Sequence, residues 1–419
     1  MVPTAFWAQL APIALLPSVI SAACTLPKTS ISATSTTPPG PSGTSFPTQA
    51  PQSWVHPGVF VSGPQLDFVA SQVRASGEPY TEAFNAMLAD PLASPCRTAK
   101  PFATVECGPT STPNIGCYDE REDSMAAYMN AIAWWVTKSK HYADKAISYM
   151  DAWSSTIKAH TNSNAPLQAA WSAANWVRVA EIIKSADVGW STKGIQDFET
   201  MLRDVYLPLM IGGNAKENGN WELVMMEASL GAAVFLEDRA LYERALSTFA
   251  ARVPAYIYLT SDGPLPVPGR DIENTRDAIV KYWNNQTTFP VDGITQETCR
   301  DFAHTSYGIS SISHVAETVR IQGTDLWAST SLGMRIHAAL ELHSPFQTGS
   351  KIPDWLCNGN ITRSFDPVVE PPFNALSFRL GMSLPNTEKL VLQQRPAPIG
   401  EAEPLFIGWE TVTNAQNPY

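Results

Sequence analysis

The 419-residue sequence has no excess of basic residues. It contains 28 Lys and Arg residues against 39 Asp and Glu residues, which gives a formal net charge of −11. A chain this acidic lacks the basic surface with which proteins neutralise the phosphates of nucleic acids, so we expect no nucleic-acid partner. The charge does not exclude an acidic ligand, because a locally positive cleft can still attract one.

The sequence also lacks a long uninterrupted hydrophobic run. Its N-terminal apolar run, residues 6–20, is broken by Pro12 and Pro17. The alternative, a membrane anchor, is disfavoured because a membrane-spanning helix needs about 20 consecutive apolar residues. Since small residues follow the run, it is typical of a signal peptide. We predict a signal peptide at residues 1–23, a secreted, extracellular protein and no membrane partner.

Residues 24–53 are poor in bulky apolar side chains and rich in Ser, Thr and Pro. Such a segment cannot bury enough apolar surface to offset the loss of backbone entropy, so we predict a solvated linker of the kind that carries O-linked glycans. From residue 54 the composition is globular, and we predict one folded domain over 54–419. Two Asn-x-Thr sequons, at Asn285 and Asn360, agree with a secreted glycoprotein.

Cysteine is scarce, and none of the six cysteines forms the CxxC pair that is common in zinc sites. We therefore expect no metal and no cofactor. In an oxidising compartment most of the cysteines should be paired. We predict one local disulfide among Cys96, Cys107 and Cys117, which flank a loop-like segment, and one long-range disulfide between Cys299 and Cys357.

Alternating strand patterns are scarce, whereas helical periodicity runs from residue 65 to residue 345. Apolar residues recur at i, i+3, i+4 and i+7 on both sides of short polar breaks; this pattern occurs in the segments 125–152, 223–252 and 309–340, with a fourth pair around 169–206. Repeated helical hairpins bury their apolar faces on each other. Because the repeats diverge and carry long insertions at 92–119 and 254–299, we predict an all-α fold, an α/α toroid formed by an incomplete barrel of six or seven helical hairpins, over an open solenoid.

The densest polar cluster lies in residues 296–308, where the third hairpin opens. Glu297, Arg300, His304 and Tyr307 follow one another at i+3 and i+4 spacing, so they share one face if the helix begins by Glu297. A carboxylate, a guanidinium, an imidazole and a phenol do not make a packing face. A solvated ladder of salt bridges is the alternative interpretation.

A second polar cluster opens the second hairpin. Asn218 or Asn220 can cap the helix, which is the structural interpretation, or can donate an amide N–H to a ligand beside the ring of Trp221. Equivalent hairpin ends lie on one rim of a toroid, so we expect the two clusters to converge. Tyr282 and Arg270, in the long insertion, are further candidates for contacts with an acidic sugar.

These residue types match what β-elimination at a uronic acid requires. Arg and Asn can neutralise the sugar carboxylate and stabilise the enediolate that develops when the α-proton leaves. His can take the C5 proton near neutral pH, and Tyr can protonate the departing O4. We therefore assign Arg300 and Asn220 to the carboxylate and His304 to the base. Glu297 can orient His304, hold Arg300 or, when protonated, donate to the sugar carboxylate.

Three segments carry a resemblance to a known family: residues 218–245, residues 296–317 with the motif E-x-x-R-D-x-x-H, and the shorter 378–390. In these segments the sequence resembles the alginate-lyase-like helical lyases, most closely polysaccharide lyase family 38, which includes enzymes acting on alginate and on glucuronan. The resemblance implies an α/α toroid with a groove for a polyuronate. It also implies an active-site asparagine at Asn220, with Asn218 as the alternative.

The resemblance places the family's glutamate and histidine at Glu297 and His304, but it does not place the catalytic tyrosine. Relatives often carry Tyr-Asn-His-Tyr before the arginine that corresponds to Arg379, where this chain has Phe-Asn-Ala-Leu at 373–376. We therefore assign the acid to Tyr307, because of its helical register with His304. Tyr282 is the alternative.

Taken together, the sequence predicts a secreted, monomeric polysaccharide lyase whose catalytic domain spans 54–419 and whose partner is an acidic polysaccharide, glucuronan or alginate, cleaved by β-elimination at the C4–C5 bond of a uronic acid. Two alternatives stay open. An inverting glycoside hydrolase needs two carboxylates about 6.5–9.5 Å apart, for which the candidates are Glu222, Glu227, Glu297 and Asp301. A non-catalytic carbohydrate-binding protein needs no base.

Overall fold

The computed structural model describes residues 46–399 and 405–419. The predicted signal peptide, most of the predicted linker and Cys24 lie outside the described residues. The last linker residues, 46–53, are described and lie along the surface of an outer helix, α9 (Arg239–Arg252), where Arg239 donates a 2.6 Å hydrogen bond to the main-chain oxygen of Gln52.

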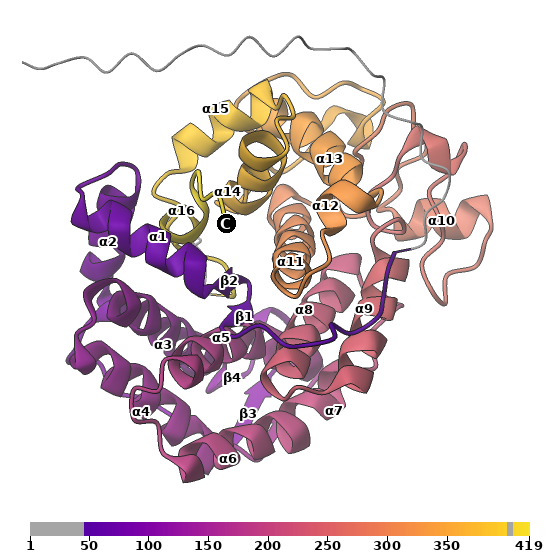
Figure 1. The fold of residues 1–419 in the computed structure, drawn as a ribbon. Helices are drawn as coiled ribbons and strands as arrows, with labels where there is room; N and C mark the ends of the chain where they lie inside the picture. Colours follow the sequence, from indigo (N-terminus) through magenta and orange to yellow (C-terminus); the bar gives the residue numbers. More distant parts are fainter. Residues whose placement is uncertain (1–45, 400–404) are drawn as a thin grey trace, which may run out of the picture. The chain divides into compact units, whose positions relative to one another are not determined.

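The helices form two layers around a ring (Figure 1). Neighbouring inner helices pack on one another in chain order: α1 (Gly63–Arg74), α3 (Cys117–Thr137), α5 (Ala165–Ser185), α8 (Gly219–Phe235) and α11 (Phe302–Ile321). Each is followed in the chain by a helix of the outer layer: α2 (Tyr80–Ala89), α4 (Lys140–Thr156), α6 (Thr192–Met201), α9 and α13 (Leu332–Gln347). This arrangement is the predicted toroid of helical hairpins.

Shorter elements complete the ring. The remaining α-helices are α7 (Leu207–Met210), α10 (Arg276–Tyr282), α12 (Leu326–Ser329), α14 (Glu370–Phe373), α15 (Pro385–Gln394) and α16 (Glu410–Asn414). The described residues include two π-helical segments, Leu202–Tyr206 and Asn374–Arg379. The strands form two small sheets: β1 (Gly58–Val59) with β2 (Val61–Ser62), and β4 (Asn114–Ile115), β3 (Thr104–Cys107) and β5 (Ala159–Thr161) in that order.

Four of the inner helices, α3, α5, α8 and α11, are buried along most of their length, because both the ring centre and the outer layer cover them, whereas α1 is buried on one side only. In α8 all residues except Trp221 are buried. Such a helix is apolar all round rather than amphipathic, which is why the Ala-rich stretches of the sequence predict it. The expected breaks in the chain, at 139–141, 237–238 and 322–325, all fall between consecutive helices or at their first residues.

The condition under which Glu297, Arg300, His304 and Tyr307 would share one helical face, a helix that begins by Glu297, is not met. Helix α11 begins at Phe302, and Asp301 is its N-cap, accepting a 2.8 Å hydrogen bond from the main-chain N–H of His304. Asp is a preferred N-cap residue because its carboxylate satisfies an unpaired N–H of the first turn. Glu297 and Arg300 therefore lie in the turn that precedes the helix.

Two disulfides join described cysteines, and both match the predictions. Cys107–Cys117 closes the loop between β3 and α3, and Cys299–Cys357 links residues 58 positions apart in the sequence. Cys96 is exposed and forms no disulfide within the described residues. Asn285 and Asn360, the two sequon asparagines, are both exposed.

The C-terminal segment 405–419 packs into the ring from the centre. Arg178 and Asn175 of α5 each donate a 2.8 Å hydrogen bond to the main chain of this segment, at Phe406 and Leu405. The imidazole of His314, on α11, lies 2.7 Å from a carboxylate oxygen of Glu410. The inner helices therefore hold this segment through buried polar groups.

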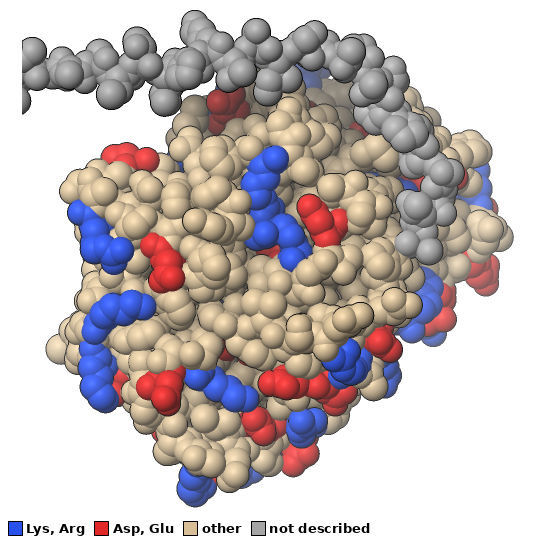
Figure 2. All heavy atoms as spheres, viewed as in Figure 1, with Lys and Arg blue, Asp and Glu red and all other residues tan. Residues whose placement is uncertain are grey.

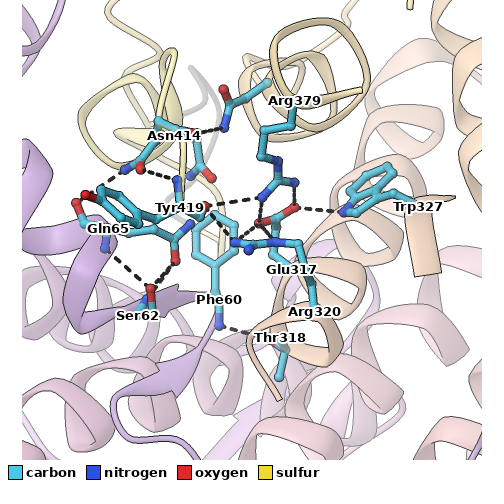
Figure 3. Close-up of polar contacts among 12 residues, drawn as sticks. Phe60, Ser62, Gln65, Glu317, Thr318, Arg320, Trp327, Arg379, Asn414 and Tyr419 are labelled. Carbon is cyan, nitrogen blue, oxygen red and sulfur yellow. Dashed lines mark hydrogen bonds and ion pairs between the residues drawn. The ribbon is translucent and has the colours of Figure 1, made fainter. Parts of the chain in front are cut away.

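A buried ion-pair network around Glu317 fixes the C-terminal half of α11 (Figure 3). Arg320 and Arg379 both donate to the buried carboxylate of Glu317, and Trp327 adds a 2.8 Å hydrogen bond from its indole. Arg379, next to which the resemblance expects a tyrosine, thus makes a structural ion pair. With a rise of about 1.5 Å per residue, Glu317 lies roughly 20 Å along the helix from His304.

The surface charge is mixed. On the face that Figure 2 presents, Lys and Arg side chains alternate with Asp and Glu side chains, and neither sign forms a continuous patch among the described residues in view. On this face, any attraction of a polyanion would come from local charges rather than from a broad basic surface. None of the helices described is both long enough and apolar enough to span a bilayer.

Candidate active site

A pocket of about 380 Å³ lies where the first turns of α8 and α11 meet. Its described lining residues are Pro109, Thr110, Ser111, Asn164, Leu167, Trp171, Asn220, Trp221, Arg300, His304, Tyr307 and Leu405. Five residues predicted from the two polar clusters are among them. The two hairpin openings therefore converge, as expected. We call this pocket the central pocket.

Tyr256 brings the two helices together. Its ring lies against Gly219 at the start of α8 and Gly308 in α11, where an added Cβ would come within 2.3 Å and 2.2 Å of ring atoms. Only glycine leaves room for this approach. The Tyr256 hydroxyl donates to the main-chain oxygen of His304 at 3.2 Å and lies 3.1 Å from Glu297. No pattern in the sequence indicated the role of Tyr256.

Asp301 holds the imidazole of His304. Nδ1 of His304 lies 2.7 Å from each carboxylate oxygen of Asp301. Burial raises the pKa of Asp301, but the hydrogen bonds from the side chain and main chain of His304 outweigh it and hold the pKa below its ordinary value. A carboxylate at Nδ1 places the proton of the neutral imidazole on that nitrogen, which leaves Nε2 with a free lone pair. His304 thus presents a base to the central pocket.

Glu297 is the centre of a buried network rather than a group that meets a substrate. Its side chain has no solvent exposure, and it accepts hydrogen bonds from Asn220 Nδ2 at 2.7 Å and from Arg300 Nη1 at 3.0 Å. Burial raises the pKa of Glu297 despite these partners and the charge of His304. Of the three roles expected for it, Glu297 fills that of holding Arg300, and it also holds Asn220.

The donors that remain on Arg300 and Asn220 belong to the central pocket. A guanidinium has five N–H donors, and Arg300 uses one of them on Glu297. The amide nitrogen of Asn220 lies 2.7 and 2.9 Å from the two oxygens of Glu297. One N–H directed between these oxygens accounts for both contacts, so a donor also remains on Asn220. The Arg300 side chain is about one-third exposed, at 32%. Because the main-chain N–H of Asn220 also donates to Glu297, at 3.1 Å, the backbone and the side chain of Asn220 are both fixed. The pocket therefore holds a cation and an amide beside the base.

Aromatic rings complete the walls. Tyr307 lies edge-on to His304, with 5.5 Å between ring centroids. Trp221 and Trp171 line the pocket from α8 and α5. Indole rings offer an apolar face on which a sugar ring can stack. The β3–α3 loop adds Ser111, whose hydroxyl accepts a 3.0 Å hydrogen bond from the buried Arg121.

Three residues assigned to substrate binding are not among the described residues that line the central pocket. Asn218 is the N-cap residue of α8, and its side-chain oxygen accepts from Gln296 at 3.0 Å. The hydroxyl of Tyr282 is 2.7 Å from Arg252 and donates to the main chain of Glu217, and burial raises its pKa to about 12. Arg270 forms an ion pair with Glu222. Each side chain is engaged in packing the 254–299 insertion against α8.

Among the residues of the site that no sequence pattern assigned are Tyr256, Asp301 as the partner of His304, Trp171 and Leu405. The signal for Asp301 was present, since an acid directly before an apolar helical run is a typical N-cap. Leu405 and Trp171 reach the pocket only through the packing of distant segments. Among the described residues, no group of three or more His, Cys, Asp or Glu side chains is arranged to hold a metal ion.

A helical toroid with a base, a cation, an amide and indole rings around one pocket belongs to the class of carbohydrate-active enzymes that includes polysaccharide lyases. The alginate lyase family matches residues 119–352, more than half of the chain. The chain therefore belongs to the alginate lyase family and is a polysaccharide lyase.

Solved structures agree on the fold. Alginate lyase A1-III from Sphingomonas species A1 is similar with a TM-score of 0.56 and 16% identity over 87% of this chain and 97% of that one. A histidine-to-alanine variant of A1-III in complex with a tetrasaccharide has a TM-score of 0.58 and 16% sequence identity, with the same coverage of both chains. An alginate lyase from Bacteroides ovatus has a TM-score of 0.54 and 13% sequence identity, over 82% of this chain and 97% of that one. At these identities the likeness establishes the α/α toroid fold alone. No curated protein matches the sequence.

Proposed function

We propose that this chain is a polysaccharide lyase of the family 38 type that cleaves a polyuronate, alginate or glucuronan, by β-elimination. One observation carries the proposal: Asn220, Arg300 and His304 line a single pocket, and Nδ1 of His304 is held by Asp301. The family match and the alginate lyases among similar structures support alginate as a substrate.

The reaction begins with charge neutralisation. A uronate carboxylate placed against Arg300 and Asn220 loses much of its charge, so its α-proton at C5 becomes more acidic. These donors also stabilise the enediolate that forms when the proton leaves, because they are fixed in place by Glu297 before the reaction starts. Preorganised donors in a partly dry site are the largest single source of such stabilisation.

Proton transfer follows. His304 takes the C5 proton on Nε2, and Asp301 stabilises the imidazolium that results. The electron pair forms the C4–C5 double bond, and the bond from C4 to the glycosidic oxygen breaks. Tyr307, on the same helix and in the same pocket, donates the proton to the departing oxygen. Each product pair has one unsaturated end and one new reducing end.

The four carboxylates that were candidates for a hydrolase mechanism are all engaged with other side chains. Each of the four candidates has a partner within the protein at 2.7–2.9 Å; the pairs are Glu222–Arg252, Glu227–His314, Glu297–Asn220 and Asp301–His304. The described residues that line the central pocket include no Asp or Glu. An inverting hydrolase needs two carboxyl groups facing the scissile bond, so this arrangement favours the lyase.

We also propose that the protein is a secreted, monomeric glycoprotein. Two disulfides are typical of an oxidising compartment. Both sequon asparagines are exposed, which glycosylation requires. Secretion would bring the enzyme to an extracellular polysaccharide. Mass spectrometry of the secreted protein, before and after removal of N-linked glycans, tests this part separately from the activity.

A panel of polymers tests the activity. The enzyme is incubated with polymannuronate, polyguluronate, glucuronan and a neutral glucan, and ultraviolet absorbance and reducing ends are followed together. The proposal predicts absorbance on at least one polyuronate, with one double bond per new reducing end, and none on the glucan. Reducing ends without absorbance would identify a hydrolase. Binding without either signal would identify a carbohydrate-binding protein.

A further inference from the structure

A second pocket, larger than the first, adjoins the central pocket at Tyr307. It has a volume of about 560 Å³. Its described lining residues are Ala303, Tyr307, Gln347, Arg363, Ser364, Phe365, Asp366, Pro367, Leu390, Gln393, Gln394, Pro398 and Ile399. Tyr307 is the residue that the two linings share. A ligand that extends past Tyr307 from the central pocket therefore enters this second pocket.

The segment 361–367 forms one wall and is fixed on the first turn of α11. The main-chain N–H of Phe302 donates to Thr362 at 3.0 Å, and that of Ala303 donates to the hydroxyl of Ser364 at 3.2 Å. The Cys299–Cys357 disulfide ties the approach to this segment to the turn before α11. The wall of the second pocket and the base His304 thus share one rigid support.

The lining offers groups that suit an acidic sugar. Arg363 is exposed and uses one guanidinium nitrogen to donate to the main chain of Ser350 at 2.8 Å, which leaves other donors for a ligand. Gln394 donates from its amide nitrogen to Phe365 and Asp366. Gln394 therefore serves to hold the wall segment 361–367 in place.

We propose that this second pocket binds the uronate residues of the polymer next to the one held in the central pocket. Arg363, exposed at the edge of this pocket, pairs with a sugar carboxylate. The inference rests on the proposed function, because it assigns the ligand as the same polyuronate chain. Its consequence is a dependence on length: substrates that span both pockets gain contacts that short ones lack.

Two substitutions test the assignment without touching the catalytic groups. Arg363→Ala removes the cation, and Gln393→Glu adds a negative charge to the exposed rim, which repels a polyanion. Each has a matched control at a residue that lines neither pocket. Arg276 is exposed and, like Arg363, donates to a main-chain oxygen, that of Thr287 at 2.7 Å, so Arg276→Ala is the first control. Gln196→Glu, on the exposed side of α6, is the second.

The readout is kcat/KM on a long polyuronate and on the shortest oligosaccharide that the wild type cleaves. A charge-assisted hydrogen bond supports a loss of about tenfold on the polymer. We expect that loss for both variants, no change on the short substrate, and no change for either control. Because Arg363 is exposed, the loss should shrink at high salt. Equal losses on both substrates, or a polymer rate matching the controls, would overturn the assignment.

Failure of the inference and failure of the proposed function can be told apart. If the wild type cleaves a polyuronate but Arg363→Ala behaves like Arg276→Ala, the lyase stands and the second pocket is not its subsite. If the wild type cleaves none, binding of the long polyuronate is measured instead. Weaker binding by Arg363→Ala than by Arg276→Ala then upholds the second pocket as a polyuronate site, and equal binding overturns it.

Discussion

The imidazole of His304 is oriented by Asp301, three residues before it in the chain, with 2.7 Å between Nδ1 and each carboxylate oxygen. The same carboxylate caps α11 by accepting from the main-chain N–H of His304. One side chain thus fixes both the first turn of the helix and the tautomer of the base. This double use explains why an acid stands immediately before the helix.

The first prediction concerns this pair. Asp301→Asn should keep the cap, because Asn is an equally good N-cap residue, but it removes the charge that stabilises the imidazolium. We expect the rate of double-bond formation to fall on the order of a hundredfold or more, with little change in melting temperature. Asp238→Asn makes the same change at the N-cap of α9 and should leave the rate intact. Full activity of Asp301→Asn would contradict the role.

The second prediction separates positioning from contact with substrate. In Glu297→Gln the new amide places an N–H where Asn220 and Arg300 both donate, so the buried network loses at least one hydrogen bond. We expect a loss of about 1–3 kcal/mol in the free energy of unfolding and a lower kcat. Tyr256→Phe removes one hydroxyl from the same carboxylate and should cost about 1 kcal/mol while keeping most activity. Urea unfolding and initial rates measure both, and a Glu297→Gln enzyme equal to the wild type would refute the positioning role.

The third prediction is a pH dependence of stability. Burial lowers the pKa of His314, but the charges of Glu227 and Glu410 outweigh burial and the nearby Arg178, and the pKa lies above its ordinary 6.5. The folded state therefore binds this proton more tightly than the unfolded state. The stability it contributes is fully present below about pH 6.5 and is lost as the pH rises through the raised folded value.

We therefore expect the free energy of unfolding of the wild type to fall more steeply above about pH 6.5 than that of His314→Gln, which has no such group. His141→Gln, at an exposed position of α4, serves as the control and should follow the wild type. Urea unfolding at several pH values measures the slopes. Parallel curves for the wild type and His314→Gln would show that His314 contributes nothing to the pH dependence.

The fourth prediction ranks the two disulfides. Cross-linking restricts the unfolded chain more when the loop is longer, which gives about 4 kcal/mol for the 58-residue separation of Cys299–Cys357 and about 3 kcal/mol for the 10-residue separation of Cys107–Cys117. Double Cys→Ser variants at each pair should therefore differ in stability in that order. Loss of Cys299–Cys357 should also lower activity, because it ties down the turn that carries Glu297 and Arg300. The reverse order would show that contacts in the native state, rather than the entropy of the unfolded chain, determine how much each disulfide stabilises the protein.

Much of the fold follows from local pattern. The Ala-rich stretches predict α3, α8 and α11 because an inner helix must be apolar on every side. The meeting of Asn220 with His304 follows from the geometry of hairpins in a ring. The shared face of the four polar residues depended on a helix that begins by Glu297. The i+3 and i+4 spacing of Glu297 and Arg300 imitates such a helix, but the N-cap Asp301 starts α11 at Phe302.

The remaining parts of the site depend on contacts that no local pattern encodes. Tyr256 matters because Gly219 and Gly308, from two helices, leave space for its ring. Leu405 reaches the central pocket because α5 holds the main chain of the C-terminal segment. Arg270, assigned to the substrate, instead meets a buried carboxylate of α8. Side chains in long insertions find partners through tertiary packing, which sequence spacing does not determine.

The most direct measurement is a crystal structure of His304→Ala with a bound uronate oligosaccharide, since this variant lacks the base but keeps Arg300, Asn220 and Glu297. We predict a sugar carboxylate within hydrogen-bonding distance of Arg300 and Asn220, with C5 of the same sugar facing the space vacated by the imidazole. A sugar whose carboxylate points to solvent, or an oligosaccharide bound outside the central pocket, would contradict the account.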